Sequence, residues 1–380
     1  MPWIDDYEII KKISRICNSL GVEVYLVGGA VRDLLLGINP VDFDFSCVVS
    51  EEKHREVTEK LSQALSCELI YNSHYCTGKL LCEWDVDFVM ARDEVYKKAA
   101  SVPEIKSSTI FDDLKRRDFS INSIAVSLQN KTYGDIIDPF QGVEDLKKKK
   151  IRVLHNQSFR DDPTRIFRGI KYASRFGFEF DEKTRCLICN AVENGFINHL
   201  SGERIKQELI SLLNEKNLRA AIKFVDEFKI LDSVTGCSVS INLDISQDIF
   251  KELKDNEKFA AILFDNNEGF LIEIQKKLSL GMEFLNYSGK LNGLKNCLQE
   301  KDEVLYRYIL KNLKGVNKKL IEAVFQREPR VGVFLENIDK IKIDIKDIMK
   351  IAEAQRDEFI LNKKIESLII LSKGGKNGFI

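Results

Sequence analysis

The sequence predicts an α+β protein, in which a mixed sheet with helices on one side is followed by an elongated all-helical region. Short apolar segments typical of strands are confined to the first 140 residues. From Asp161 onward, apolar residues recur at helical spacing, as in ERIKQELISLLN and LRAAIKFVDEFKIL. Only six prolines occur among 380 residues, so few helices need be interrupted.

The first part of the chain is expected to combine strands and helices. A strand over residues 21–27 runs into the glycine pair Gly28–Gly29, which opens a helix that extends to residue 37. Another helix is expected over residues 50–66, with Ser50 as its N-cap. Further strands are expected over residues 41–49, 67–72, 77–83 and 84–91, and residues 108–128 predict a helix, a turn and a second helix.

The length of the chain predicts more than one unit. At about 100–200 residues per domain, 380 residues correspond to two to four units. We expect a head over residues 1–140, a helical segment over residues 141–212, and a helical body and tail over residues 213–380.

Composition excludes some classes of protein. The chain is 44% hydrophobic and 31% charged, as in a globular protein with a heavily charged surface. No apolar stretch reaches about 18 residues, so no transmembrane helix and no membrane partner are expected. The N-terminus MPWIDDYEIIKKIS lacks the basic and apolar regions of a signal peptide, which predicts a cytoplasmic protein.

The cysteines and the net charge give no strong functional signal. Nine cysteines are scattered, and the closest pair, Cys186 and Cys189, is expected to be buried in a helix rather than to bind metal. A net charge of −1 gives no global nucleic-acid footprint. Local basic patches are the run Lys147–Lys150 with Arg152 and a cluster made of Lys311, Lys314, Lys318 and Lys319, although such runs are often only solvated faces.

Paired carboxylates on two expected strands are the first chemical signal. Asp42 and Asp44 in VDFDF are two residues apart and therefore share one face of a strand, and Asp85 and Asp87 in WDVDFV repeat the pattern. If the two strands are neighbours, three or four carboxylates lie close together. Their oxygen atoms are the kind of ligand that suits Mg²⁺. The alternative is an exposed strand face that happens to be acidic.

A glycine turn before the first acidic strand is the second signal. Gly28 and Gly29 end a strand and open a helix, where unpaired N–H groups attract phosphate, and Arg32 lies one turn further on. The alternative is an ordinary strand–helix turn. The sequence lacks the GK[ST] of a P-loop, which argues against a metabolic kinase.

In combination, these segments resemble the class II tRNA nucleotidyltransferase and bacterial poly(A) polymerase family. LVGGAVRDLLLG followed by VDFDF resembles the first signature of that family, and the later matches follow in the same order. They are YCTGKL, DVDFVMARDEVY, DDLKRRDFSINSIAV, IIDPFQGVEDLKKKKIRVL, RDDPTRIFRGIKYASRFGF and SGERIKQEL. The resemblance extends from about Tyr25 to Leu212, and the remaining residues carry no recognisable signature beyond being helical.

The resemblance implies a polymerase-β-like nucleotidyltransferase head that uses Mg²⁺, and it assigns expected roles residue by residue. The head over residues 1–140 would be the catalytic palm, residues 141–212 a helical neck that recognises the base, and residues 213–380 a body and tail that bind tRNA. Metal would be held by Asp42 and Asp44, with Asp87 as the third carboxylate. Nucleotide-binding residues would be Gly28, Gly29 and Arg32 at the triphosphate, Arg117, Asp118 and Asn122 near sugar and phosphates, Asp162 and Arg165 at the base, and Arg168 and Lys171 beside them.

The pair Asp162 and Arg165 has a chemistry suited to selecting C and A. Three residues apart, the two side chains would share one face of a helix. An aspartate accepts from the amino group of cytosine or adenine, whereas guanine and uracil present a carbonyl there. Taken alone, DDPTR also suits a helix N-terminus, because acidic residues and proline are favoured in a first turn.

Four positions depart from the family pattern. Asp161 stands where glutamate is usual, and Lys171 replaces an arginine, which keeps the charge but loses the fork of donors. Ser123 and Gly78 each replace an alanine. The four histidines form no HxxxH pattern, so no metal phosphohydrolase unit is expected.

The function implied is template-independent addition of C and A to the 3′ end of tRNA from CTP and ATP, with release of pyrophosphate. The alternatives are an A-adding enzyme, a CC-adding enzyme, a poly(A) polymerase, and a non-catalytic RNA-binding protein that retains the fold. Residues 91–108 lie where a specificity loop is expected.

Overall fold

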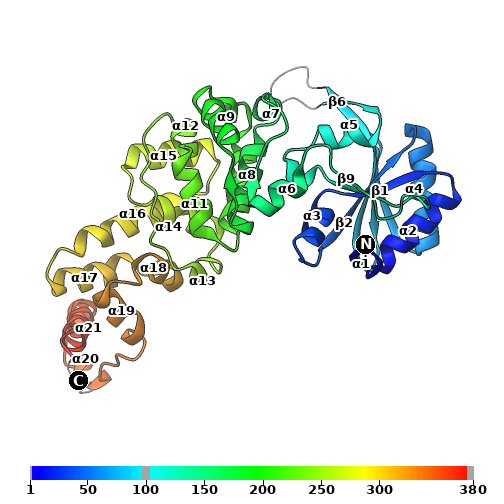
Figure 1. The fold of residues 1–380 in the computed structure, drawn as a ribbon. Helices are drawn as coiled ribbons and strands as arrows, with labels where there is room; N and C mark the ends of the chain where they lie inside the picture. Colours follow the sequence, from blue (N-terminus) through cyan, green and yellow to red (C-terminus); the bar gives the residue numbers. More distant parts are fainter. Residues whose placement is uncertain (1, 96–102, 375–380) are drawn as a thin grey trace. The chain divides into compact units, whose positions relative to one another are not determined.

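The computed structural model describes residues 2–95 and 103–374, and their side chains from residue 4 onward (Figure 1). The chain divides into two compact units, Met1–Leu200 and Ser201–Ile380. The first contains the sheet, and the second consists of helices and their connections in the part that the structure describes. The division into residues 1–140, 141–212 and 213–380 stays a prediction.

The first unit is built on a seven-stranded mixed sheet of order β3-β4-β5-β2-β1-β8-β9. Only the pair β2 and β5 is parallel, and the other neighbours are antiparallel. The strands are β1 Glu23–Val27, β2 Asp42–Val48, β3 Glu68–Asn72, β4 Thr77–Leu81, β5 Asp85–Met90, β8 Ala125–Ser127 and β9 Ile136–Ile137.

The remaining elements of the first unit are mainly helices. They are α1 Pro2–Asp5, α2 Glu8–Ser19, α3 Gly29–Leu35, α4 Glu51–Leu65, α5 Ile110–Lys115, η1 Ser120–Asn122, α6 Gly142–Lys148, α7 Ser158–Asp161, α8 Thr164–Phe176, α9 Glu182–Glu193 and η2 Phe196–His199. Two small two-stranded sheets pair β6 Arg92–Val95 with β7 Glu104–Ser107, and β10 Lys150–Ile151 with β11 Glu179–Phe180.

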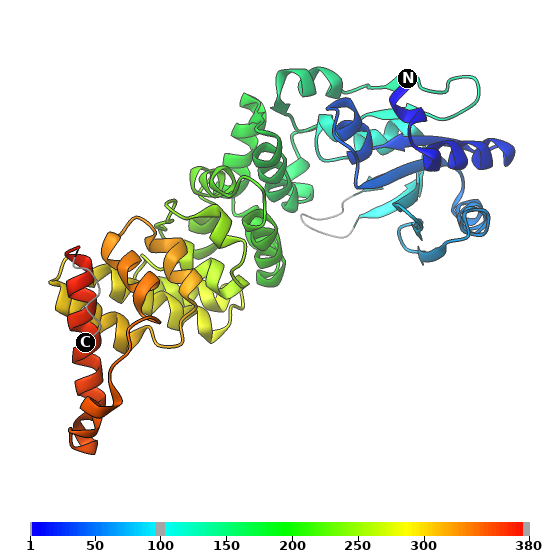
Figure 2. The same cartoon turned by 90° about the horizontal axis from the view of Figure 1, so that it is seen from below.

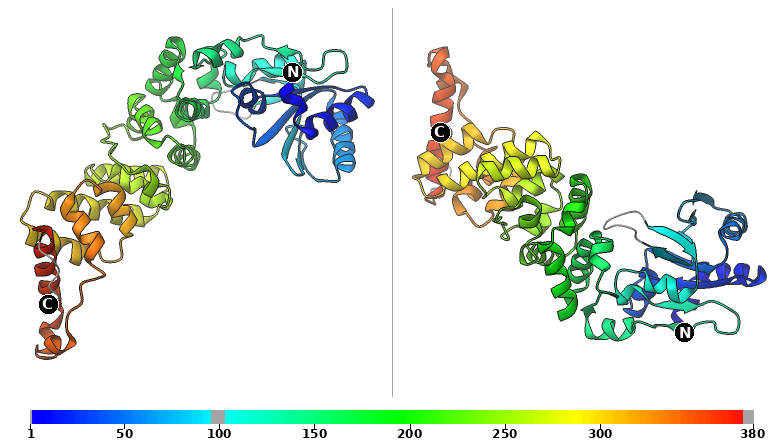
Figure 3. Two further views of the ribbon diagram at one scale, coloured as in Figure 1. Left: turned by 60° about the horizontal axis from the view of Figure 1, so that its bottom comes forward. Right: turned by 90° about the horizontal axis from the view of Figure 1, so that it is seen from above.

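The described residues of the second unit form helices joined by loops, as Figures 2 and 3 show in green to red. Its elements are α10 Gly202–Leu213, α11 Leu218–Glu227, α12 Ile230–Thr235, α13 Gln247–Phe250, α14 Asp255–Leu263, α15 Glu268–Lys277, α16 Met282–Cys297, α17 Asp302–Asn312, α18 Lys318–Phe325, α19 Pro329–Asn337, α20 Ile345–Met349, η3 Glu353–Gln355 and α21 Arg356–Ser372. The predicted fold class, a mixed sheet with helices followed by a helical region, is confirmed.

The sheet has one face whose apolar side chains pack under helices α2 and α4. Phe43 and Phe45 of β2 are fully buried on that face. The Phe43 ring lies 5.1 Å from that of Tyr7, just before α2, and 5.3 Å from that of Trp84. His54 of α4 stacks on Phe88 of β5. Because successive side chains alternate, Asp42 and Asp44 occupy the opposite face.

That opposite face also carries a helix, so the expectation of helices on one side only is wrong. Leu114 of α5 packs with Tyr25, Val27 and Ala125 of β1 and β8. Val27 is the register partner of Asp44 and therefore points to the same face of the sheet as the carboxylate. Helix α5 therefore lies on the same face of the sheet as the carboxylates.

Two further local expectations are corrected. Residues 108–128 form a helix, a short 3-10 turn and the strand β8 rather than two helices, because SIAVS pairs with β1 across the sheet. Cys186 is exposed rather than buried, and Cys189 is partly exposed. Ser50 caps α4 as expected, accepting a hydrogen bond from the Lys53 amide.

The departure at Gly78 has a packing explanation. A Cβ at Gly78 would lie 2.2 Å from Cγ2 of Thr58, a fully buried residue of α4. The methyl group of Thr58 therefore occupies the space that an alanine side chain would need.

We therefore expect Gly78→Ala to destabilise the protein by about 1–3 kcal/mol, as overpacked cores do. Adding Thr58→Ser, which removes only the clashing methyl group and keeps the hydroxyl bonded to the His54 carbonyl, should restore most of the loss. Chemical denaturation of both single variants and the double variant measures this coupling. Gly289→Ala on α16, where a Cβ meets nothing within 4 Å, is the control and should not destabilise the protein.

Candidate active site

The glycine turn after β1 meets both an arginine and a carboxylate. Gly28 has φ +70° and caps the start of α3. A Cβ at this position would lie 2.7 Å from Nη1 of Arg117 and 3.2 Å from Oδ2 of Asp44. Glycine is therefore required twice here, by the positive φ and by the close approach of the two side chains. The turn, Asp44 and Arg117 form one site.

The carboxylates of β2 and β5 lie in register. Asp42 is opposite Asp85 and Asp44 is opposite Asp87 on this parallel pair, so all four side chains share the face that the sequence predicts. Lys79 of β4 is opposite Asp87, and its Nζ lies 3.2 Å from Oδ2 of Asp85. Asp42 and Asp85 are exposed, whereas Asp44 and Asp87 are partly buried.

The electrostatics of these four carboxylates favour a bound cation. Burial, together with the neighbouring carboxylates of Asp42 and Asp87, raises the pKa of Asp44 to about 6, although Arg117 acts in the opposite direction. Burial also raises the pKa of Asp87, with Asp42 and Asp85 adding to it against Lys79. Among the described residues, no three acidic, histidine or cysteine side chains could hold a metal ion by themselves. A divalent cation bound by Asp42 and Asp44 would therefore complete its shell with water and phosphate, as Mg²⁺ commonly does.

Arg117 is held in place by a residue that the sequence patterns did not single out. Its Nη2 lies 2.9 Å from Oδ2 of Asp113, a fully buried residue of α5. Arg116 binds the other oxygen of Asp113 through Nε at 3.0 Å and Nη2 at 2.6 Å. Burial alone would raise the pKa of Asp113, but the two arginines lower it to about 2. The four-residue spacing of Asp113 and Arg117, which is typical of side chains that meet on a helix, was the available signal, although α5 itself ends at Lys115.

A chain of hydrogen bonds joins the residues assigned to phosphates and sugar. Nη1 of Arg32 donates to Oδ1 of Asn122 at 2.7 Å, and Nδ2 of Asn122 donates to Oδ1 of Asp118 at 2.9 Å. Nε of Arg168 donates to Oδ2 of Asp118 at 2.7 Å. Burial disfavours the Asp118 carboxylate, but Arg168 and Asn122 outweigh it and lower its pKa. Asp118 is therefore a charged residue that already holds Asn122 and Arg168.

Arg32 is buried by two aromatic rings that were not singled out from the sequence. Its guanidinium carbon lies 5.1 Å from the ring centre of Tyr172 and 4.9 Å from that of Phe176, both on α8. Its Nη2 also pairs with Asp33 at 2.8 Å. Only 5% of Arg32 is exposed, so a direct contact with a triphosphate would require α8 to leave room. The i, i+4 spacing of Tyr172 and Phe176 was the only signal.

Asp162 and Arg165 come together, but not on one helical face. Asp162 lies between α7 and α8 in an extended conformation, with φ −140°, so its expected helical position is wrong. Its Oδ2 nevertheless lies 4.0 Å from Nε of Arg165. Its Oδ1 accepts from the amide and hydroxyl of Thr164 at 3.0 and 2.6 Å. Asp162 therefore serves the start of α8 with one oxygen and faces Arg165 with the other.

Arg165 is fixed by two further contacts. Nη1 donates to Oγ of Ser158 at 2.7 Å, and Nη2 donates to the Arg116 carbonyl at 2.8 Å. These bonds connect α7 and α8 to the segment that carries Arg117. Lys171 lies further along α8 and is partly exposed.

The basic runs are largely paired with acidic residues. In the first unit, Lys148 pairs with Glu144 at 3.2 Å and Lys150 with Glu179 at 3.0 Å. Arg152 pairs with Asp145 at 2.6 Å. In the second unit, three of the four lysines have partners: Lys311 pairs with Glu358, Lys318 with Asp339 and Lys319 with Glu252. These pairs reduce the positive potential available to a nucleic acid.

Comparisons with known proteins agree with this fold. Residues 24–152 match the poly A polymerase head domain. The chain is 35% identical to an A-adding tRNA nucleotidyltransferase of Halalkalibacterium halodurans, over 62% of this chain and 56% of that protein. It is 32% identical to a CCA-adding enzyme of Francisella tularensis subsp. novicida, over 68% of this chain and 69% of that protein.

Two solved structures of CCA-adding enzymes match nearly the whole chain. A CCA-adding enzyme in an apo form matches with a TM-score of 0.77 at 27% identity, over 94% of this chain and 91% of that one. The Thermotoga maritima CCA-adding enzyme complexed with tRNA matches with a TM-score of 0.73 at 26% identity, over 97% and 91% of the two chains.

The match to the poly A polymerase head domain, together with the sheet and its acidic face, identifies the protein as a nucleotidyltransferase. Within that class, the chain belongs to the class II tRNA nucleotidyltransferase family. It spans 56%, 24% and 44% of the lengths of three curated A-adding relatives that it matches. None of the helices in the described part of the chain is long and apolar enough to cross a membrane.

Proposed function

We propose that the protein transfers nucleotides from CTP and ATP to the 3′ end of tRNA and releases pyrophosphate. The observation that supports this best is the meeting of Gly28, Arg117 and Asp44 beside the carboxylates of the parallel pair β2 and β5. A triphosphate at the turn would meet positive charge from Arg117, while the RNA 3′-hydroxyl would approach the carboxylates. Both reacting groups would then be held in one geometry.

We further propose that Asp42 and Asp44 hold Mg²⁺, with Asp87 as the neighbouring third carboxylate. Bound there, the cation would make the 3′-hydroxyl a better nucleophile and stabilise the charge on the leaving pyrophosphate. Arg117, fixed by Asp113, would add a charge-assisted contact to the phosphates. Asp118 and Asn122 would orient the sugar through the network that they share with Arg32 and Arg168.

The base would be selected by protein side chains, without a template. Thr164 bonds only to Oδ1 of Asp162, and Oδ2 faces Arg165. Oδ2 can therefore accept a hydrogen bond from the amino group of C or A. Arg165 would donate to the ring. Arg168 and Lys171 on α8 would lie beside this pair.

Addition of only the terminal A is the second candidate. The relatives from Halalkalibacterium halodurans, Geobacter sulfurreducens and Aquifex aeolicus are named A-adding enzymes, whereas the two Francisella tularensis relatives are named CCA-adding enzymes. A CC-adding enzyme and a poly(A) polymerase are the remaining alternatives in this chemistry. The helical unit after Leu200 would bind the acceptor arm of tRNA.

Extension of two tRNA transcripts, one that ends before C74 and one that ends at C75, separates these activities when CTP and ATP are supplied separately and together. A full CCA-adding enzyme extends a transcript that ends before C74 when both nucleotides are present, and it adds A after C75. An A-adding enzyme extends only the transcript that ends at C75, and a CC-adding enzyme stops at C75. Long A tails on any RNA would indicate a poly(A) polymerase, and no incorporation by the purified full chain with Mg²⁺ would contradict the proposal.

A further inference from the structure

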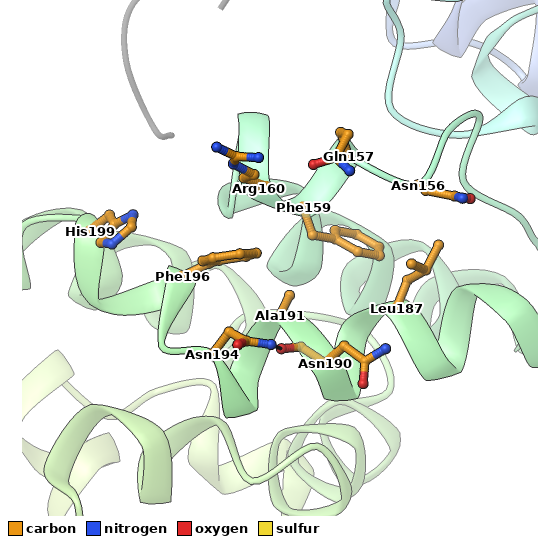
Figure 4. Close-up of a pocket in the computed structure, with 10 residues that line it drawn as sticks. All are labelled: Asn156, Gln157, Phe159, Arg160, Leu187, Asn190, Ala191, Asn194, Phe196 and His199. Atoms are coloured by element: carbon orange, nitrogen blue, oxygen red, sulfur yellow. Dashed lines mark hydrogen bonds between the residues drawn. The ribbon is translucent and has the colours of Figure 1, made fainter. Parts of the chain in front are cut away.

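A hollow lies in the first unit, and none of the residues that line it belongs to the acidic face of the sheet. It has a volume of about 410 Å³ and lies between the segment that contains α7 and the end of α9 with η2 (Figure 4). This volume falls within the range of about 300–1,000 Å³ that is typical of small-molecule sites. The residues around it include no aspartate or glutamate, which suits an anionic ligand.

The inner surface of the hollow is apolar and aromatic. Phe159 of α7 is 1% exposed and forms part of the wall. Leu187 of α9 and Phe196 of η2 are partly exposed and face the same space in Figure 4. The Phe196 ring, whose centre lies 6.0 Å from that of His199, is partly exposed and can stack on a nucleobase, because every base has a flat π face.

The rim of the hollow is polar and includes three side chains that are free to meet a ligand. Gln157 and Asn190 present side-chain amides, and Arg160 presents a guanidinium group. The structure gives these three exposed side chains no hydrogen-bond partner among the described residues. Amides can match the donor and acceptor edges of a base, and an arginine fork suits a phosphate.

The hollow shares α7 with the base-selecting pair. Gln157, Phe159 and Arg160 line it, while Ser158 between them accepts the hydrogen bond from Arg165, and Asp162 follows α7 directly. A ligand in the hollow therefore contacts the same short segment that positions Arg165. This placement favours a nucleotide of the RNA acceptor over an unrelated metabolite.

We propose that this hollow binds one unpaired nucleotide near the 3′ end of the RNA acceptor, with its base against Phe196 and its phosphate at Arg160. The assignment to RNA rests on the proposed function, whereas the nucleotide chemistry rests on the lining residues. A free nucleotide offers the same chemistry, so the experiment must distinguish the two sources.

The test uses the full chain with three single variants: Phe196→Leu, which removes the ring, Asn190→Leu, which removes the amide, and Arg160→Ala. Steady-state addition of A to a tRNA that ends in CC should show a KM for tRNA raised roughly tenfold in each variant, since a stacked base or a charged contact contributes on that order. The KM for ATP and kcat should stay within about twofold. Lys183→Ala, which removes an exposed charge on α9 outside the hollow, is the matched control and should change none of these.

Direct binding keeps the test independent of catalysis. Fluorescence anisotropy with labelled tRNA should show weaker binding by the variants even if the wild-type chain incorporates no nucleotide, which separates failure of this proposal from failure of the proposed function. Unchanged tRNA affinity and unchanged KM in all three variants would overturn it. So would a loss of CMP or AMP binding, measured by calorimetry, without any change for tRNA, because the hollow would then serve a free nucleotide. Thermal unfolding confirms that each variant is folded.

Discussion

Replacement of Asp44 by asparagine is expected to reduce nucleotide incorporation by roughly 10³-fold or more. A cation held by Asp42 and Asp44 would supply several kcal/mol of charge stabilisation to the transition state, and each 1.36 kcal/mol corresponds to about tenfold in rate. Asp42→Asn should cause a loss of the same order, because both carboxylates project from one face of β2. Incorporation of labelled ATP and CTP into tRNA at saturating Mg²⁺ measures the effect.

A carboxylate of the same row provides the control for this prediction. Asp85 lies opposite Asp42 on β5, but it is exposed and its charge is matched by Lys79. Asp85→Asn should therefore retain activity within about threefold, since exposed ion pairs contribute little. In the absence of divalent metal, Asp44→Asn should unfold at a temperature no lower than that of the wild type, because it removes one of several neighbouring negative charges. Full activity in Asp42→Asn and Asp44→Asn would favour a non-catalytic RNA-binding protein.

The four carboxylates of β2 and β5 show what local sequence patterns can predict and what they cannot. The two-residue spacing within VDFDF and WDVDFV fixes which face each pair shares, because side chains alternate along a strand. It does not fix which strands are neighbours: β2 and β5 are separated in sequence by α4, β3 and β4, and their parallel pairing depends on the packing of that whole segment. The sequence therefore predicts that the two pairs of carboxylates meet only if their strands are neighbours, and the fold shows that they are.

Interactions between distant segments account for what the sequence missed. The burial of Arg32 depends on α8, which lies more than 130 residues later, and no local pattern links the two. Asp162 was expected on a helix because three-residue spacing is helical, but it is followed by Pro163, which disfavours the helical conformation at the preceding residue. Asp162 thus serves two roles, and only the fold distinguishes the oxygen bonded to Thr164 from the one that faces Arg165.

Replacement of Asp162 by asparagine is expected to weaken the choice of base while preserving the fold. The side-chain oxygen of asparagine can accept the same hydrogen bonds from the amide and hydroxyl of Thr164, so stability should change by less than about 1 kcal/mol. Its amide group can donate to the carbonyl of guanine or uracil, which the carboxylate cannot. The ratio of kcat/KM for ATP over GTP should therefore fall by about 10- to 100-fold, the range expected when one buried polar mismatch is relieved.

The neighbouring residue allows this effect to be separated from a general loss of negative charge at the start of α8. Asp161→Asn makes the same substitution one position earlier, at the end of α7, and should leave the ATP to GTP ratio unchanged. Arg165→Lys should lower kcat/KM for both correct nucleotides, because lysine keeps the charge but cannot hold Ser158 and the Arg116 carbonyl together. An Asp162→Asn enzyme that still rejects GTP and UTP as strongly as the wild type would place base selection elsewhere in the protein.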